Sequence, residues 1–188
     1  MRARVFALIV LVIPGLAATA LRGADAVIAE PEGYRTADYR APTPKSLAGA
    51  RVVTTQEAAA LWTSHDAIFV DVMPRPPRPV GLPSGTVWRD TPRLNIPGSV
   101  WLPDTGYGEL APATADYFRH GLEAATANDR ARAVVFYCLK DCWMSWNAAK
   151  RAIALGYANV VWYPDGTDGW ANAGLPLEDG TPAAKAER

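Results

Sequence analysis

Two cysteines, the only ones in the chain, stand four positions apart in the segment FYCLKDCWMSWNAAKRA, residues 136–152. Cys138 ends an apolar run, and Cys142 precedes a tryptophan and a predicted helix. A thiol in such a place can act as a nucleophile or carry a sulfur atom. If the loop curls, Cys142 can attack an oxidised or persulfidated Cys138 and form a disulfide. The pair therefore predicts thiol chemistry, with Cys138 as the nucleophile and Cys142 as the resolving thiol.

The alternatives for this pair are a static local disulfide or two buried thiols. A bridge that closes so short a loop restricts the unfolded chain by only about 2 kcal/mol, so stabilisation alone explains the spacing poorly. Two sulfurs fall short of a closed zinc site, and the only histidines, His65 and His120, lie far away in the sequence. Haem attachment needs a Cys-x-x-Cys-His motif, which the chain lacks. We therefore expect no metal centre here.

The elements that must position the cysteines are buried strands and the helices between them. AVVFYC, residues 133–138, predicts a strand ending at Cys138, and AIFVDV, residues 67–72, predicts another that ends in the carboxylate of Asp71. Ser145 is a candidate cap for a helix over WNAAKRAIAL, which stops at Gly156. In a parallel sheet, ligands sit beyond the carboxyl ends of the strands. We expect the Cys138 sulfur to project into an open crevice there, where loop amides and the helix dipole favour a thiolate.

The remaining segments complete an alternation of strands and helices. Thr54 and Glu57 form a capping box that predicts a helix over 55–63, and Thr114 is a candidate cap for a helix over 115–126. Short strands are expected at 99–102 and over NVVWYP, followed by a tight loop over DGTDGW that Asp165, Asp168 and Trp170 shape beside the site. This order predicts an α/β fold with a mostly parallel sheet and helices on both faces.

Residues 73–95 form a long stretch with six prolines and four arginines, which predicts a stiff loop. A loop of this length is either functional or a solvated insertion. Its arginines either present a rim that binds anions or form a solvated face, and the solvated face is the favoured interpretation. These arginines are Arg75, Arg78, Arg89 and Arg93.

The N-terminus indicates export. Residues 1–26 combine a basic start, an apolar run and small-x-small sites after which cleavage would follow Ala20 or Ala26, which is typical of a secretory signal peptide. A retained membrane anchor is the alternative, but the run is short and contains a Pro-Gly break. Residues 27–49 predict an extended segment, with Tyr34 and Tyr39 as candidates to hold it on the domain. Lysine plus arginine and aspartate plus glutamate both number 19, so a nucleic-acid partner is not expected.

Four short motifs in this order resemble the rhodanese-like superfamily over residues 50–177. They are IFVDVMP, IPGSVWLP, the segment VVFYCLKDCW with the helix that follows it, and the final DGW. The resemblance implies a rhodanese-like domain, residues 50–180, in which Cys138 falls on the nucleophile that carries sulfane sulfur. Phosphatase-like members need an arginine that closes the loop, whereas this chain has Trp143 and Met144 there. Phosphatase chemistry is therefore not expected.

The motif CLKDCW resembles a smaller group, the Cys-x-x-x-Cys-Trp proteins associated with catabolism dependent on pyrroloquinoline quinone (PQQ). The flanks GYRTADYRAPTP, DTGYG and WYPDGTDGW are similar to that group as well. The resemblance implies a periplasmic protein that works beside quinoprotein alcohol oxidation. Its expected partners are a periplasmic quinoprotein dehydrogenase or cytochrome and a small-molecule thiol or sulfur donor. PQQ or another quinone is the candidate cofactor.

Two functions of different classes follow for the cysteine loop. The first is an enzyme, a sulfurtransferase or thiol–disulfide redox protein, with Cys138, Cys142 and Asp71 as catalytic residues. Asp71 either orients the loop or only caps a turn. The second is a non-catalytic module that binds a quinone or a partner protein, with Trp143 and Trp146 either lining a cofactor pocket or packing in the core. The candidate binding residues are Lys140, Asp141, Trp143, Met144, Ser145 and Trp146.

Overall fold

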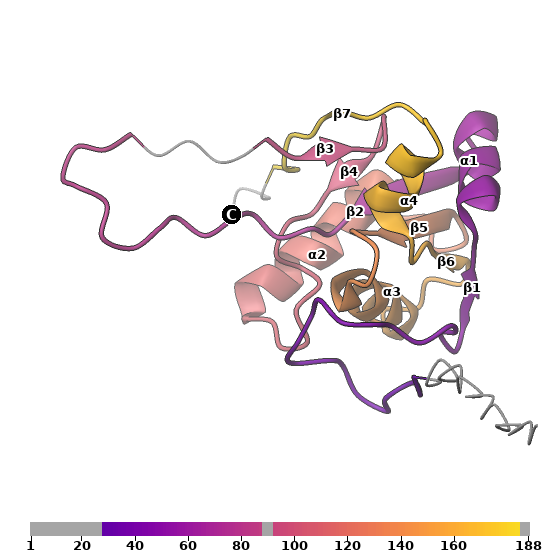
Figure 1. Ribbon diagram of the computed structural model, residues 1–188. Coiled ribbons are helices and arrows are strands. Elements are labelled where there is room, and N and C mark those ends of the chain that lie inside the picture. Colours follow the sequence, from indigo (N-terminus) through magenta and orange to yellow (C-terminus); the bar gives the residue numbers. More distant parts are fainter. Residues whose placement is uncertain (1–27, 88–91, 185–188) are drawn as a thin grey trace, which may run out of the picture.

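The computed structural model of the 188-residue chain describes residues 28–87 and 92–184, so the predicted signal peptide and Arg89 lie outside the described residues. Five strands form one sheet in the order β1-β6-β5-β2-β4 (Figure 1). In that order they are Ala50–Val52, Val160–Trp162, Ala133–Tyr137, Ala67–Asp71 and Val100–Trp101. Every neighbouring pair is parallel, which confirms the predicted parallel sheet.

Helices cover both faces of this sheet, as predicted (Figure 1). The helices are α1 Thr55–Ser64, α2 Pro112–Ala125, α3 Trp143–Ala154 and α4 Gly166–Asn172. Successive residues of β5 point to opposite faces, because side chains alternate along a strand. Phe136 and Cys138 belong to the core that packs against α2 and α3. Val135 and Tyr137 belong to the core that packs against α1 and α4. The Cys138 side chain therefore lies on the face of the sheet that α2 and α3 cover.

Local signals set some of the helix ends. The capping box before α1 is confirmed, because the Glu57 amide donates to Thr54 Oγ1 at 3.3 Å and the Thr54 amide donates to Glu57 Oε2 at 2.8 Å. The predicted cap Thr114 is wrong, because α2 begins two residues earlier at Pro112. Proline suits the first turn of a helix, where its missing N–H leaves no donor unpaired. Gly156 ends α3 with φ of +87°, as expected of a left-handed glycine.

The beginning of α3 and the segment after β6 differ from the predictions. The helix α3 begins at Trp143, so Ser145 is not its cap. Ser145 is buried in the first turn, where its hydroxyl donates to the Cys142 carbonyl at 3.2 Å and accepts from Trp162 Nε1 at 3.0 Å. The expected tight loop over DGTDGW is instead the short helix α4, which begins at Gly166.

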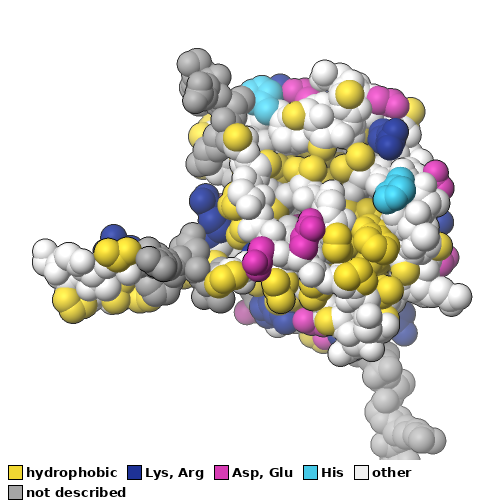
Figure 2. Space-filling view, turned by 90° about the horizontal axis from the view of Figure 1, so that it is seen from above, with side chains coloured by type: hydrophobic (Ala, Val, Ile, Leu, Met, Phe, Trp, Pro, Cys, Tyr) yellow, Lys and Arg dark blue, Asp and Glu magenta, His cyan; other side chains and the backbone are white. Residues whose placement is uncertain are grey.

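The long loop after β2 projects from the body of the protein as an arm, seen from two sides in Figures 1 and 2. Val80 is 99% exposed and Val87 is 80% exposed, so the arm buries little of its own apolar surface. Where the loop returns to the body of the protein, Leu94–Asn95 forms β3, which pairs antiparallel with β7, Glu178–Asp179. These two strands were not predicted. None of the helices over residues 28–87 and 92–184 is long and apolar enough to cross a membrane.

Candidate functional site

The two cysteines are joined as a disulfide between β5 and α3. Cys138 directly follows β5, and Cys142 directly precedes α3 as its N-cap residue. Their Cα atoms are 6.3 Å apart. The prediction that the loop curls until the sulfurs meet is therefore confirmed. The predicted open crevice is wrong, because Cys138 is fully buried and Cys142 is 2% exposed. The packing of α3 and of the segment before β1 over this edge of the sheet accounts for the burial.

The loop between the cysteines is held from α4, with Leu139 half-buried against the core and the next two residues exposed. Lys140 and Asp141 are exposed, and the Lys140 amide donates to Asp168 Oδ2 at 3.1 Å. Asp141 has φ of +53°, a left-handed conformation that aspartate tolerates better than most residues. Asp168, predicted to shape a tight loop, instead lies in the helix α4 and accepts the Lys140 amide from there. Lys140 and Asp141 are therefore the exposed part of the loop between Cys138 and Cys142.

The carbonyl of Cys138 accepts three hydrogen bonds. The amide and hydroxyl of Thr167 donate to it at 3.1 Å and 3.3 Å, and Arg93 Nη2 donates at 3.1 Å. Gly166 lies so close that a Cβ at this position would stand 2.6 Å from the same oxygen. The start of α4 and Arg93 therefore fix the peptide that carries the first sulfur.

Asp71 lies at the end of β2, beside β5, and is fully buried. Its Oδ2 lies 2.7 Å from Arg93 Nη2 and 2.8 Å from Arg93 Nε, and its Oδ1 accepts the Met73 amide at 2.8 Å. Burial raises the pKa of Asp71 to about 6, while the positive charge of Arg93 opposes that rise. Asp71 does not touch either sulfur. It acts on the loop by orienting Arg93, so it is a positioning residue.

Arg93 is a site residue that the sequence prediction missed by grouping it with a solvated face. Its side chain is only 13% exposed and joins three elements, because it binds Asp71, Cys138 and the Thr167 hydroxyl at 3.3 Å. By contrast, Arg75 and Arg78 are exposed on the arm, in agreement with a solvated face. The arm therefore leaves the body at Met73 and returns to the site at Arg93.

Met73 brings a third sulfur to the disulfide. Its Sδ lies 3.5 Å from Cys138 Sγ. The backbone of Met73 is held on both sides, because its amide donates to Asp71 and its carbonyl accepts from Trp101 Nε1 at 2.7 Å. Sequence reasoning missed this contact. A signal was present, since β2 and β5 are adjacent parallel strands with Asp71 opposite Tyr137, and the residues after each therefore meet at one edge.

The segment before β1 closes the other side of the loop. The Trp143 amide, the first of α3, donates to the Tyr39 carbonyl at 2.9 Å. The Tyr39 hydroxyl accepts the Gly108 amide at 3.2 Å, and the Arg151 guanidinium lies 4.6 Å from the centre of the Tyr34 ring. These contacts confirm that the two tyrosines hold the segment on the domain. The Tyr39 carbonyl also explains why α3 begins earlier than predicted.

Asn147 on α3 clasps the same segment. Its side chain is fully buried and exchanges two hydrogen bonds of 2.9 Å with the backbone amide and carbonyl of Arg35. A third bond of 2.9 Å runs from Asn147 Nδ2 to the Gly106 carbonyl. All of these partners are main-chain groups, so Asn147 recognises the path of the chain rather than a particular side chain.

The tryptophans after the second cysteine pack in the core. Trp143 is 3% exposed, Trp146 is fully buried, and their rings meet edge to face at 5.4 Å. Trp146 Nε1 donates to the Ser46 carbonyl at 3.2 Å. Met144 is also buried, with its Cβ and main chain close to Gly106. Of the two interpretations of these rings, the structure shows the core packing.

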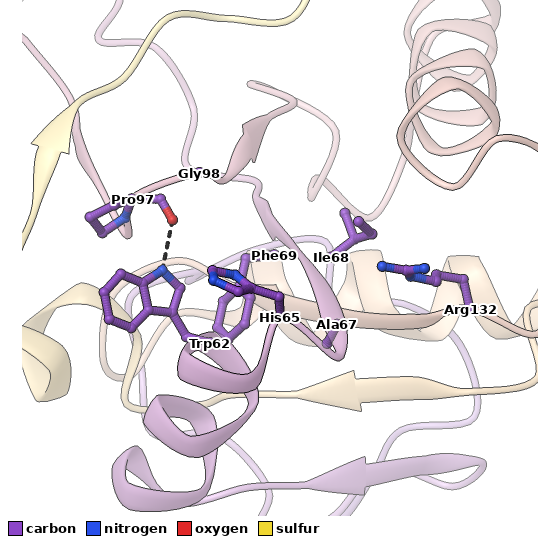
Figure 3. A pocket seen from close by; sticks show the side chains of 8 residues that line it. All are labelled: Trp62, His65, Ala67, Ile68, Phe69, Pro97, Gly98 and Arg132. Atoms are coloured by element: carbon purple, nitrogen blue, oxygen red, sulfur yellow. Dashed lines mark hydrogen bonds between the residues drawn. The ribbon is translucent and has the colours of Figure 1, made fainter.

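A hollow of about 430 Å³ lies at the opposite edge of the sheet (Figure 3). It opens where β2 begins and just before β5, and Trp62 Nε1 donates to the Pro97 carbonyl at its wall at 2.8 Å. The cysteines lie at the far ends of these strands, so this hollow is separate from the disulfide. Its lining consists of Trp62, His65, Ala67, Ile68, Phe69, Pro97, Gly98 and Arg132.

Residues 54–173 match the family model described as a rhodanese-like domain, which is more than half of the chain. The chain belongs to the rhodanese-like domain family. The match confirms the predicted rhodanese-like fold and includes β2, the cysteine loop, α3 and α4. No curated protein matches the chain.

Three solved structures are similar to parts of the chain. A thiosulfate sulfurtransferase from Pseudomonas aeruginosa is 21% identical with a TM-score of 0.46, and the match covers 71% of this chain and 21% of that chain. A polysulfide-sulfur transferase from Wolinella succinogenes is 17% identical with a TM-score of 0.43, over 71% of this chain and 82% of that chain. An uncharacterised protein from Saccharomyces cerevisiae is 20% identical with a TM-score of 0.43, over 66% and 93% of the two chains.

Proposed function

We propose that this rhodanese-like protein is a periplasmic thiol–disulfide redox protein whose Cys138–Cys142 pair cycles between disulfide and dithiol in quinoprotein alcohol catabolism. The observation that carries the redox part is the disulfide itself, which joins the position of the rhodanese nucleophile to a second thiol in the same loop. A structural bridge that closes so short a loop would add only about 2 kcal/mol of stability. Reversible chemistry is the better reason for the pair.

The two sulfurs have different roles in the exchange. Cys142 stands at the N-terminus of α3, a helix of 12 residues, where the helix dipole favours a thiolate. The sulfur with the more stable thiolate leaves more readily, so an incoming thiolate attacks Cys138 and releases Cys142. Because Cys138 is fully buried, this attack requires the cover over the loop to open. A second thiolate of the reductant then attacks the mixed disulfide and frees Cys138. The cycle moves two electrons and two protons and leaves two thiols on the protein.

Sulfur transfer uses the same residues in the reduced protein. A sulfur donor places a sulfane sulfur on Cys138, and Cys142 attacks the Cys138 sulfur of that persulfide. The products are the Cys138–Cys142 disulfide and hydrosulfide, so the donor's sulfur is reduced while the protein is oxidised. Membership of the rhodanese-like family supports this branch. A reductant of the dithiol class must then restore the thiols.

The periplasmic location and the metabolic role rest on sequence patterns. The basic, apolar and small-residue layout of residues 1–26 supports export, and the CLKDCW motif with its flanks supports the association with PQQ-dependent catabolism. A quinoprotein dehydrogenase or a cytochrome is the proposed partner. Binding of a quinone as the main function has less support, because Trp143 and Trp146 are both buried.

A redox titration of the native protein tests the proposal. The protein is equilibrated in buffers of reduced and oxidised dithiol, its free thiols are alkylated, and the alkylated fraction is measured by intact mass. We expect a reversible two-electron transition in the folded protein and a persulfide on Cys138 when Cys142→Ser is given a sulfur donor. A disulfide that yields only after the protein is unfolded would be structural, and the proposal would be rejected.

A further inference from the structure

We propose that the reduced Cys138–Cys142 pair and the Met73 thioether together bind one cuprous ion. Met73 Sδ lies 3.5 Å from Cys138 Sγ, and the second cysteine is close enough to bond to the first. The Cys138 sulfur therefore contacts both the Met73 thioether and the Cys142 sulfur. The inference rests on the proposed function only in that the disulfide must be reducible in the folded protein.

The spacing of the sulfurs suits one shared ion. A metal–thiolate bond is about 2.3 Å long for zinc, so two sulfurs on an ion of similar size lie about 3.5 to 4.6 Å apart as the angle between the bonds widens. The thioether and the Cys138 sulfur already stand at 3.5 Å, the short end of this range. Reduction breaks the sulfur–sulfur bond and lets the two cysteine sulfurs separate.

Met73 is held in place by its backbone. The Asp71 carboxylate accepts its amide at 2.8 Å, and Trp101 Nε1 donates to its carbonyl at 2.7 Å. Both partners are buried, so the thioether is presented to Cys138 by fixed neighbours.

The ligand set selects the metal. Thiolate and thioether sulfurs are soft ligands that favour Cu(I), whereas zinc sites use cysteine, histidine and carboxylate. Over residues 28–87 and 92–184, no group of three or more His, Cys, Asp or Glu side chains is placed to hold a metal ion, so harder ions lack a comparable site. Two thiolates and one Cu(I) leave one negative charge. Arg93, 3.1 Å from the Cys138 carbonyl, and the N-terminus of α3 are placed to stabilise it.

The binding step changes no oxidation state. A dithiol reductant first supplies two electrons and two protons to the disulfide and is itself oxidised to a disulfide. Cu(I), added as the cuprous ion, then replaces the two thiol protons, which are released to solvent. Oxidation of the pair withdraws both thiolates, so the oxidised protein is expected to bind no copper at this site. Copper loading and disulfide formation are therefore mutually exclusive.

A competition titration tests the site. The reduced full-length protein is titrated with Cu(I) in the presence of a chromophoric cuprous chelator, without oxygen and after free thiols have been counted. We expect one equivalent to bind and Met73→Leu to weaken the affinity at least tenfold. Leucine has a similar volume, so the variant should fold. The matched control is Met144→Leu, which removes the other described thioether beside this loop and should change the affinity less than twofold.

X-ray absorption of the copper-loaded protein counts the sulfur atoms bound to copper. This count would not change if Met73 had only a structural role. We expect three sulfur neighbours in the wild type and two in Met73→Leu. An unchanged affinity and sulfur count in Met73→Leu, or equal weakening in Met144→Leu, would overturn the site. A protein with two counted thiols that binds no copper also overturns it and leaves the proposed redox function intact. A disulfide that dithiol buffers cannot reduce instead rejects the proposed function, and a phosphine reductant then allows the copper test.

Discussion

Arg93 ties the buried carboxylate of Asp71 to the carbonyl of Cys138, with Nη2 2.7 Å from Asp71 Oδ2 and 3.1 Å from the Cys138 oxygen. The Arg93 side chain thereby joins the ends of β2 and β5. Arg93 lies where the arm returns to the body of the protein. The described residues 75–87 of the arm are largely exposed, so Met73 and Arg93, at its two ends, are the contacts that connect it to the cysteine loop.

Replacing Arg93 should strongly destabilise the protein. In Arg93→Met the Asp71 carboxylate is left buried without its partner, which costs about 3 to 5 kcal/mol in the free energy of unfolding. The measurement is urea unfolding at pH 7. The control is Arg75→Met, which breaks the exposed Arg75–Asp104 pair of 3.7 Å and should cost less than about 1 kcal/mol. Asp71→Asn added to Arg93→Met should recover part of the loss, and failure to do so would contradict the ion-pair explanation.

Asp71 should also make stability depend on pH. Burial raises its pKa from 3.8 to about 6, so the folded state binds the proton more tightly than the unfolded state. Its stabilising contribution is present below pH about 4 and is lost as the pH rises through about 6. The free energy of unfolding should fall over this window by at most about 1.4 kcal/mol per pH unit. Unfolding curves of the wild type and Asp71→Asn test this, since equal slopes would exclude Asp71 as the source.

Removing the resolving thiol should trap chemistry on Cys138. In Cys142→Ser, a mixed disulfide or persulfide on Cys138 has no neighbouring thiol to displace it, so the adduct should persist at least tenfold longer than in the wild type. Intact mass at timed intervals after addition of a disulfide or sulfur donor measures the lifetime. Cys138→Ser provides the comparison. If Cys142 carries the longer-lived adduct in that variant, the two roles are reversed.

Gly166 should be intolerant of alanine. Its φ is +53°, and an added Cβ would stand 2.6 Å from the Cys138 carbonyl oxygen. Gly174 has φ of +71° but open space around it, so Gly174→Ala measures backbone strain alone, about 1 to 2 kcal/mol. Gly166→Ala should cost at least about 1 to 3 kcal/mol more in unfolding free energy and should shift the reduction midpoint of the disulfide. Equal losses in the two variants would show that the close approach has no energetic weight.

The Asn147 clasp should control the order of the segment before β1. Asn147→Ala leaves the buried Gly106 carbonyl unpaired, at about 1 to 3 kcal/mol, and frees the half-buried amide and carbonyl of Arg35 at a smaller cost. Amide hydrogen exchange over 28–49 should become faster, and the exposed Asn172→Ala should leave it unchanged. If amide hydrogen exchange over 28–49 is as slow in Asn147→Ala as in the wild type, other contacts hold the segment.

Patterns that are local in the sequence predicted most of the fold. β2 and β5 are continuous apolar runs, and α1 carries a capping box, so a few neighbouring residues are enough to predict each element. The strands β3 and β7 have two residues each, too few for any period, and they exist only because they pair with one another. The start of α3 was missed because its first amide is satisfied by Tyr39, about a hundred positions away in the chain.

The same distinction separates the site residues that were found from those that were missed. The spacing of Cys138 and Cys142 predicted that their sulfurs can meet if the loop curls, and the structure shows that they do. Arg93 and Met73 acquire their roles through contacts across strand ends, and the burial of the disulfide depends on packing that no motif encodes. Lys140 and Asp141, predicted as binding residues, are exposed, and nothing in the structure assigns them a ligand.

The segment 28–49 lies wholly upstream of the residues 54–173 that define the family, yet it supplies the carbonyl on which α3 begins. A homologue that shares only the matched residues therefore presents its reactive cysteine under a different cover, or under none. Part of the cover over Cys138 in this protein therefore comes from residues outside the matched region. Two rhodanese-like proteins with the same cysteine loop can therefore differ in how far that loop is exposed, according to what their chains place in front of it.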